Sequence, residues 1–219
     1  MKNDGEKHNN TGKQKDRKLQ DFFGLEGPFS SFMNTLGNII WTGLLWLVTS
    51  IPLITMGCSA MGASRATEKT RKNQGYITKE FFAGFIGDWK TALPMQAVNL
   101  IFFIWLIFDC IYLYGYEAEY ALVISYVLYG ILFFALGLNC YYYPCLRIFE
   151  GNFFEIFKIS FYMTFRHLLT TIALVGLIAA ALLIIYLMPW SIMIVPGLWW
   201  YAADILIQRV IRKEIGETV

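Results

Sequence analysis

The chain has 219 residues, of which 57% are hydrophobic, 17% aromatic and 16% charged, and its formal net charge is +2. A soluble domain of this size carries about 25% charged residues, so the composition argues against a soluble domain and predicts a protein solvated by lipid. The net charge is too small for a nucleic-acid-binding protein, and the basic residues lie between the apolar runs, as in membrane proteins.

The predicted fold class is all-α, a polytopic transmembrane helical bundle with two cytoplasmic interfacial amphipathic helices. A hydrocarbon core about 30 Å thick needs about 20 apolar residues for each helical crossing. We expect five crossings, at about 36–51, 93–114, 120–143, 168–187 and 192–207. They form a single transmembrane helical domain over 21–213, between a disordered polar tail at 1–20 and a short C-terminal tail at 214–219.

The first apolar run is preceded by an aromatic segment at 21–35, which we expect to lie at the lipid headgroups. The run is then interrupted at Pro52 and Gly57. Proline disfavours helical geometry in the residue before it, so the helix should end near this point. The small residues that follow would let another helix approach closely. Alternatively, this break lines a substrate path, as the broken helices of transporters do.

Two short segments carry aromatic residues at a spacing of four, which places those residues on one face of a helix. We interpret both as interfacial helices whose aromatic stripes anchor them at the membrane surface. The first stripe consists of Phe81, Phe85 and Trp89, and the second of Phe153, Phe157, Phe161 and Phe165.

The distribution of lysine and arginine predicts the orientation, because short cytoplasmic loops are enriched in these residues. Segment 65–90 has six, segment 147–166 has three and the C-terminal tail has three, whereas the turns at 115–119 and 188–190 have none. Both interfacial helices and the C-terminus should therefore be cytoplasmic. The N-terminal tail also has six basic residues. Either it is translocated, which we favour, or the first segment bends at 52–57 and returns without spanning.

Three polar residues within or beside the crossings are candidate functional residues. Asp109 is the acidic residue inside the second crossing, where an acid is by default a functional hypothesis. The functional interpretations of Asp109 are proton coupling and a polar contact to substrate. The alternative is a contact with lipid headgroups. Asp204 in the last crossing is expected to make a structural hydrogen bond or ion pair. Arg147 should reach lipid phosphate, or alternatively a cytosolic partner.

The sequence lacks the common catalytic and nucleotide-binding motifs, such as GxSxG, HExxH and the P-loop. His167 has no second histidine or carboxylate at metal-ligand spacing. We therefore expect no enzyme activity, catalytic residue, metal or other cofactor. The four cysteines lie in or beside apolar runs without a CxxC pair, and we expect free thiols.

A set of motifs spread over 22–211 resembles the YesL family, bacterial integral membrane proteins that form a domain of unknown function. The polar tail before Asp21 is longer than the family's usual start. The matching residues are Gly27-Pro28-Phe29, Asn34, Leu36-Gly37, Leu44-Leu45-Trp46, Ile51-Pro52, Thr55-x-Gly57, Gly75-Tyr76, Phe81-Phe82, Phe85, Asp109, Tyr143-Pro144 and Arg147.

The resemblance implies a multi-pass protein of the bacterial plasma membrane whose genes often neighbour carbohydrate ABC importers. It implies no established reaction. The leading hypothesis is a non-enzymatic accessory protein that contacts ABC transporter permease subunits and lipid through its two interfacial helices. The alternative is a small permease, with 52–57 as the broken helix and Asp109 as its intramembrane polar site. A membrane enzyme built on Asp109, Asp204 and Arg147 is a third hypothesis.

Overall fold

The computed structural model describes residues 28–87, 89–114, 119–149 and 151–216. The predicted disordered tail at 1–20, most of the turn at 115–119 and the last three residues lie outside this part of the chain. The chain divides into two compact units, residues 1–38 and 39–219. Each is considered by itself.

In the first unit, the described residues form the beginning of helix α2 (Pro28–Thr49). Residues 28–35 of the predicted headgroup segment thus belong to the same helix as the first predicted crossing, and their position at the headgroups stays a prediction. Proline at the start of a helix loses no intrahelical hydrogen bond, because the first N–H groups have no partner there. Pro28 is therefore well suited to its place as the first residue of α2.

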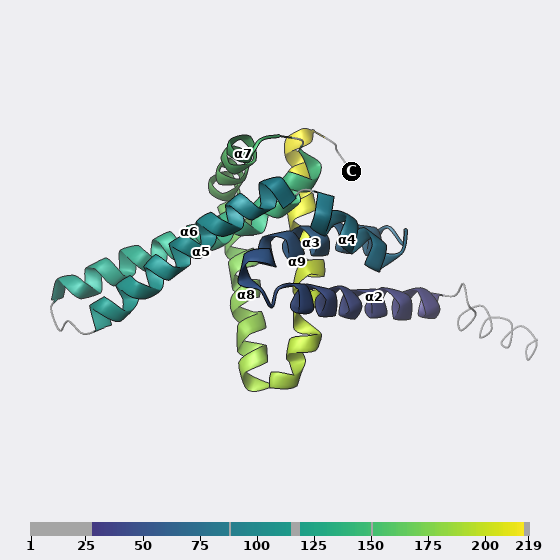
Figure 1. The fold of residues 1–219 in the computed structure, drawn as a ribbon, viewed down its shortest axis with the longest axis horizontal. Coiled ribbons are helices and arrows are strands. Elements are labelled where there is room, and N and C mark those ends of the chain that lie inside the picture. The colour runs from purple at the N-terminus through teal and green to yellow at the C-terminus, as the bar shows by residue number, and fades with distance from the viewer. Residues whose placement is uncertain (1–27, 88, 115–118, 150, 217–219) are drawn as a thin grey trace, which may run out of the picture. The chain divides into compact units, whose positions relative to one another are not determined.

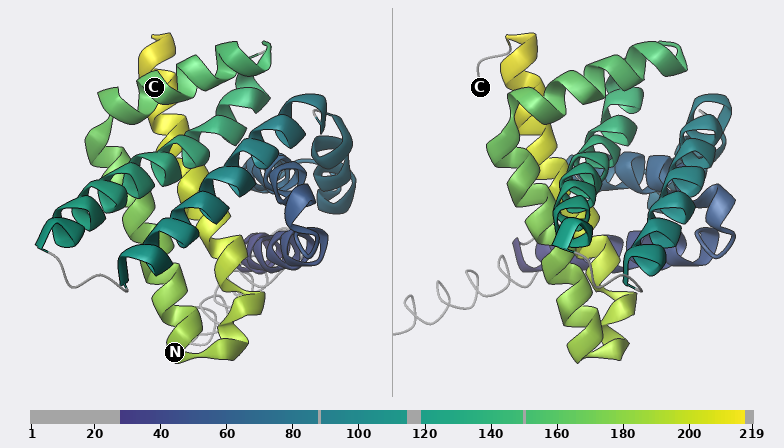
Figure 2. Two further views of the ribbon diagram at one scale, coloured as in Figure 1. Left: turned by 60° about the vertical axis from the view of Figure 1, so that its left-hand side comes forward. Right: turned by 90° about the vertical axis from the view of Figure 1, so that its left-hand side faces the viewer.

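The second unit is helical throughout its described elements, which confirms the all-α fold class (Figure 1). Figures 1 and 2 show α8 and α9 side by side as a hairpin joined through η2. After α2 the elements are η1 (Leu53–Thr55), α3 (Met56–Arg71), α4 (Ile77–Gly87), α5 (Trp89–Tyr114), α6 (Glu119–Ile148), α7 (Phe153–Arg166), α8 (Leu168–Leu187), η2 (Pro189–Met193) and α9 (Val195–Ile215).

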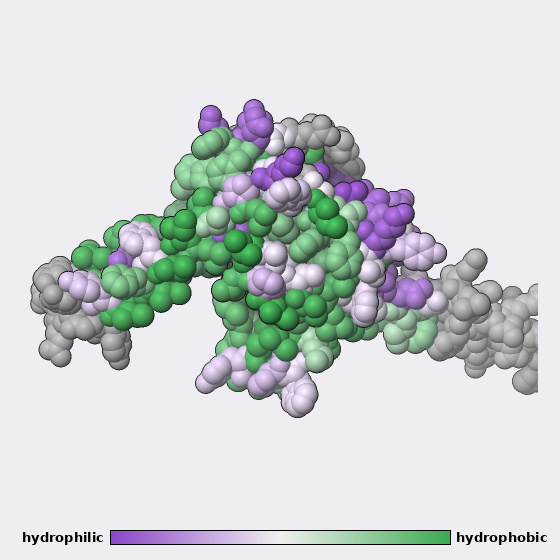
Figure 3. All heavy atoms as spheres, viewed as in Figure 1, coloured by the Kyte–Doolittle hydropathy of each residue, from purple (hydrophilic) through white to green (hydrophobic). Residues whose placement is uncertain are grey.

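Three of the described helices are long and apolar enough to cross a membrane, namely α5, α6 and α8. Their apolar spans are Trp89–Leu113, Val123–Ile148 and Leu168–Leu187. Figure 3 shows hydrophobic residues over α5, α6 and the α8–α9 hairpin, and hydrophilic residues gathered near α4 and α7. These three spans indicate that the chain is a membrane protein. The first and last predicted crossings, in α2 and α9, are not among the three, so the count of five stays a prediction.

Helix α3 packs against α4, α5, α6 and α9, and its small residues allow this. A methyl group added at Gly62 would lie 2.8 Å from the carbonyl oxygen of Phe81 on α4. That close approach leaves the Phe81 side chain fully buried. The prediction that Phe81 anchors a membrane surface is therefore wrong, because a four-residue spacing identifies a helix face but not what covers it.

Helix α6 continues through Pro144 to Ile148, whereas the third crossing was expected to end near Tyr143. Pro144 lacks the N–H donor that a helix interior normally uses, and α6 nevertheless runs four residues farther to Ile148. Arg147 consequently projects from helical backbone rather than from a loop. The thiols of Cys58, Cys140 and Cys145 are free and buried, as predicted.

Candidate functional site

The strongest polar feature of the second unit is an ion pair between Arg147 on α6 and Asp204 on α9. The Nη1 atom of Arg147 lies 3.1 Å from Oδ1 of Asp204, and the two side chains are only 7% and 3% exposed. Gln208, one turn farther along α9, donates to both carboxylate oxygens at 3.0 and 3.1 Å. Two candidate residues that are 57 positions apart in the sequence are thus brought into direct contact.

Helix α3 supplies the remaining partners. The same Nη1 of Arg147 donates to the carbonyl oxygen of Ser64 at 2.6 Å and to its hydroxyl at 2.9 Å. Glu68 lies 3.3 Å from Nε of Arg147, and Arg71 lies 3.4 Å from the second oxygen of Asp204. We call Glu68, Arg71, Arg147 and Asp204 the buried charge cluster. It joins three helices through alternating charges.

The neighbours of Glu68 shift the pKa of its carboxyl group. Burial acts to raise its pKa, but a hydrogen bond from Lys72 and the positive charges of Arg147, Lys72 and Lys69 outweigh it, and the pKa is lowered. Glu68 is therefore ionised at neutral pH and balances the charge of Arg147. Each charge of the cluster has an opposite neighbour, and these ion pairs join three helices.

A cavity of about 450 Å³ lies one helical turn from this cluster. Ala60, Tyr143 and Trp200 line it, and each precedes a polar residue of the cluster region by four positions, namely Ser64, Arg147 and Asp204. Four residues rise about 6 Å along an α-helix. The charge cluster thus lies about one helical turn beyond the cavity, toward the C-terminal ends of α6 and α9. We call this space the bundle cavity.

The bundle cavity is lined by apolar side chains and four uncharged polar ones. Asn99 and Asn139 exchange hydrogen bonds across α5 and α6. Tyr143 donates to Gln96 at 3.3 Å. The full lining is Trp46, Leu53, Met56, Ala60, Gln96, Asn99, Leu100, Phe103, Ile104, Ile107, Leu136, Asn139, Cys140, Tyr143, Ile178, Trp199 and Trp200.

The predicted helix break forms part of the same wall. The chain leaves α2 at Thr49, passes Pro52 and turns through η1, whose Leu53 lines the cavity. The side-chain amide of Gln96 donates to the carbonyl oxygen of Leu53 at 3.0 Å. At Gly57 an added methyl group would lie 2.9 Å from the carbonyl oxygen of Ala92. Gln96 thus satisfies a backbone carbonyl oxygen at the break.

Asp109 does not share this site. It lies on α5, half-buried, two residues beyond Ile107 at the edge of the bundle cavity, and it is not part of the lining. No residue of the buried charge cluster forms an ion pair with Asp109. The structure therefore brings Arg147 and Asp204 together and leaves Asp109 apart from the cavity wall.

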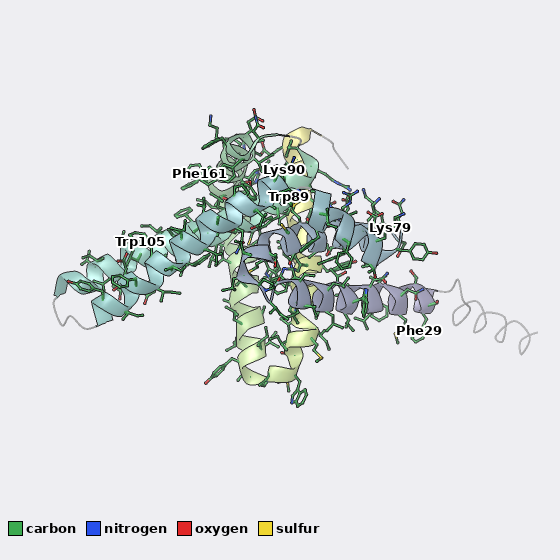
Figure 4. The ribbon with its side chains drawn as sticks, in the orientation of Figure 1. Phe29, Lys79, Trp89, Lys90, Trp105 and Phe161 are labelled. Atoms are coloured by element: carbon green, nitrogen blue, oxygen red, sulfur yellow. The ribbon has the colours of Figure 1, made fainter. Side chains whose placement is uncertain are left out.

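The two aromatic stripes have different surroundings. In the first, Phe85 is packed against the core and Trp89 belongs to the start of α5, where it is 48% exposed (Figure 4). In the second, neighbouring rings contact one another along α7. Phe153 and Phe157 are partly buried, whereas Phe161 is 50% and Phe165 44% exposed.

Sequence reasoning missed a second ion-pair group. Glu214 near the end of α9 lies 2.8 Å from Nε2 of His167 and 2.9 Å from Nε of Arg166. The His167 hydrogen bond lowers the pKa of Glu214, although burial opposes it, and Arg166 adds its charge. The separation of 47 residues explains why spacing gave no signal. The group joins the α7–α8 junction to α9.

Among the described residues there is no group of histidine, cysteine, aspartate and glutamate side chains that could hold a metal ion. Comparison of the chain with protein-family models, curated proteins and solved structures gives no significant match. The resemblance to the YesL family therefore stays a prediction. What the site defines is a helical membrane protein with a cavity lined by uncharged residues and a charge cluster about one helical turn away.

Proposed function

We propose that the chain is a non-enzymatic accessory protein of the bacterial plasma membrane that contacts permease subunits of a carbohydrate ABC importer. The family resemblance and the three membrane-capable helices support the setting. In the proposed topology five segments cross the bilayer, and the basic segments, α4, α7 and the C-terminus are cytoplasmic.

The observation that carries the proposal is the outer face of α7. Phe154 is 73% exposed, and Phe161 and Tyr162 are each 50% exposed. Large aromatic side chains exposed together on one helix are the usual anchors of protein–protein contacts. Either a partner subunit or lipid headgroups could cover these aromatic side chains, and we assign them to the partner subunit.

Helix α7 is held firmly in place, as a docking surface requires. Asn152 and Glu155 form a capping box at its start. The ring of Phe165 stacks on Phe134 of α6 at a centroid distance of 4.5 Å. Arg166 pairs with Glu214 of α9. A partner that binds this face would therefore meet a preorganised helix and lose little entropy in ordering it.

The proposal is tested by affinity purification of the tagged chain from bacterial membranes in mild detergent, followed by mass spectrometry. We expect a permease subunit to co-purify, and its recovery to fall several-fold for the double variant Phe154→Ala, Phe161→Ala. The control is Tyr76→Ala, because Tyr76 is 84% exposed but precedes α4. Absence of any permease subunit with the wild-type chain, or equal recovery for all variants, overturns the proposal.

A small permease is the second candidate, and the position of the helix break favours it. In transporters, broken helices line the substrate site, and here Leu53 and Met56 after the break line the bundle cavity. Uptake of a labelled disaccharide into proteoliposomes tests this function. Uptake that Asn139→Leu abolishes and Asp109→Asn leaves unchanged would establish the cavity as the path, without Asp109 as its coupling acid. No uptake would remove this candidate.

A further inference from the structure

A second hollow lies on the surface, between η1 and the first turns of α5. Its volume is about 380 Å³. Ile54 of η1 is 57% exposed and Trp89 of α5 is 48% exposed, so the hollow is open to its surroundings. We call it the surface groove, and its lining consists of Ile54, Trp89, Lys90, Leu93, Pro94 and Ala97.

The two sides of the surface groove are held together by contacts beneath it. The side-chain amide of Gln96 on α5 donates to the carbonyl oxygen of Leu53 at 3.0 Å, next to Ile54 in the chain. Just after η1, a methyl group added at Gly57 would lie 2.9 Å from the carbonyl oxygen of Ala92 on α5. The backbones on both sides of the groove are therefore fixed against each other. A ligand that binds there meets a preorganised surface.

The groove has a charged end and an apolar end. Lys90 is the second residue of the span Trp89–Leu113, which is long and apolar enough to cross a membrane, and Figure 4 shows Trp89 and Lys90 at the start of α5. A lysine at the end of such a span places its ammonium group at the level of the lipid phosphates. From Lys90 to Ala97 the helix rises about 10 Å, and one leaflet contributes about 15 Å of hydrocarbon. The groove thus leads from the headgroups into the acyl region.

The charge of the groove is not balanced within the protein. Among the described residues Lys90 forms no ion pair, and none of the residues that line the groove is acidic. The phosphate of an anionic phospholipid would supply the missing negative charge. A zwitterionic phospholipid would also bring a positive group, for which the lining offers no partner.

We propose that the surface groove binds one anionic phospholipid of the bilayer. Its phosphate pairs with Lys90, and the upper part of one acyl chain lies along Leu93, Pro94 and Ala97. The groove is too small for the whole lipid, so the rest of this chain and the second chain stay in the bilayer. This site is independent of the proposed docking face on α7.

Native mass spectrometry of the detergent-solubilised chain tests the proposal. The chain is titrated with phosphatidylglycerol or with phosphatidylcholine that carries the same acyl chains. We expect one phosphatidylglycerol molecule to bind per chain, several-fold more tightly than phosphatidylcholine. Lys90→Gln should abolish this preference, whereas Lys90→Arg should retain it because the positive charge stays. Equal binding of the two lipids by the wild-type chain overturns the proposal.

Two matched controls separate the groove from a general effect of surface charge or hydrophobicity. Lys79→Gln removes an exposed lysine on α4, outside the groove, and should keep the preference. Ala97→Phe fills the apolar end of the groove and should weaken phosphatidylglycerol binding several-fold, whereas Ala83→Phe on α4 should not. Lys90 and Ala97 are exposed, so all variants should keep the wild-type unfolding temperature. A control variant that loses as much binding as its groove counterpart overturns the assignment.

Discussion

The guanidinium group of Arg147 on α6 lies 3.1 Å from the carboxylate of Asp204 on α9, and Glu68 on α3 lies 3.3 Å from the same guanidinium. Three helices that are distant in sequence are thereby joined at one point next to the bundle cavity. A buried ion pair contributes little compared with well-packed apolar residues, but losing one partner leaves the other charge buried alone.

Replacing Arg147 by methionine should therefore destabilise the protein by about 3 to 5 kcal/mol. Glu68 and Asp204 would both lose a partner, although Asp204 keeps Arg71. Thermal unfolding in detergent, followed by circular dichroism, measures the loss. Arg209→Met is the control, since Arg209 is exposed on the same α9 helix as Asp204. A similar unfolding temperature for both variants would contradict a structural role for the cluster.

Gly197 on α9 should tolerate no side chain. A methyl group added there would lie 2.1 Å from the backbone carbonyl oxygen of Ile39, and backbone atoms cannot move aside as a flexible side chain does. Gly197→Ala should cost about 3 kcal/mol through overpacking. Gly176→Ala in α8 has open space and should instead stabilise the helix by about 0.5 to 1 kcal/mol. Unfolding temperatures that move in the same direction would refute this packing.

Acid should weaken the fold through Glu68 and Glu214, because both carboxylates have a lowered pKa in the folded protein. A carboxylate whose pKa is lowered by folding stabilises the folded protein at pH values above its ordinary pKa of 4.5. This stabilisation is lost as the pH falls through the lowered pKa of the folded protein. The unfolding temperature should thus decline below about pH 4.5. Glu68→Gln and Glu214→Gln should each flatten this decline. A variant with the full wild-type dependence would show that its carboxylate is not linked to folding.

The proposed topology predicts which reagents reach two exposed loop positions. Tyr76 precedes α4 and is 84% exposed, and Trp190 lies in η2 and is 87% exposed. In a Cys110→Ala background, Tyr76→Cys should react with an impermeant maleimide only after the cytoplasmic side is opened. Trp190→Cys should react in intact cells. The native Cys58, Cys140 and Cys145 are buried and should stay unlabelled. Labelling of both loops from the same side would disprove the topology.

Much of the helical layout could be predicted from the sequence. The second predicted crossing, 93–114, falls within α5, and the fourth matches α8, because long apolar runs need no tertiary information to be recognised as helices in lipid. Helix ends that were predicted from the positions of proline were less accurate. Pro28 begins α2, where no N–H donor is required, whereas Pro144 lies inside α6, where the helix forms despite the missing donor.

The candidate site could be predicted only as separate residues. Arg147 and Asp204 stood out as polar groups in apolar surroundings, but their contact spans 57 residues and the contact of Arg147 with Ser64 spans 83. Periodicity reports neighbours three or four residues apart on one helix and carries no information about such distances. The same limit explains Phe81, whose spacing suggested a surface while Gly62 on α3 covers it.

Composition and the order of apolar runs were enough to establish that this chain is a helical membrane protein, because transfer from water to lipid depends on the side chains alone. The pairing of its buried charges and the cavity near them arise from packing between helices. That packing depends on which surfaces meet at close range, and it becomes visible only when the helices are placed together.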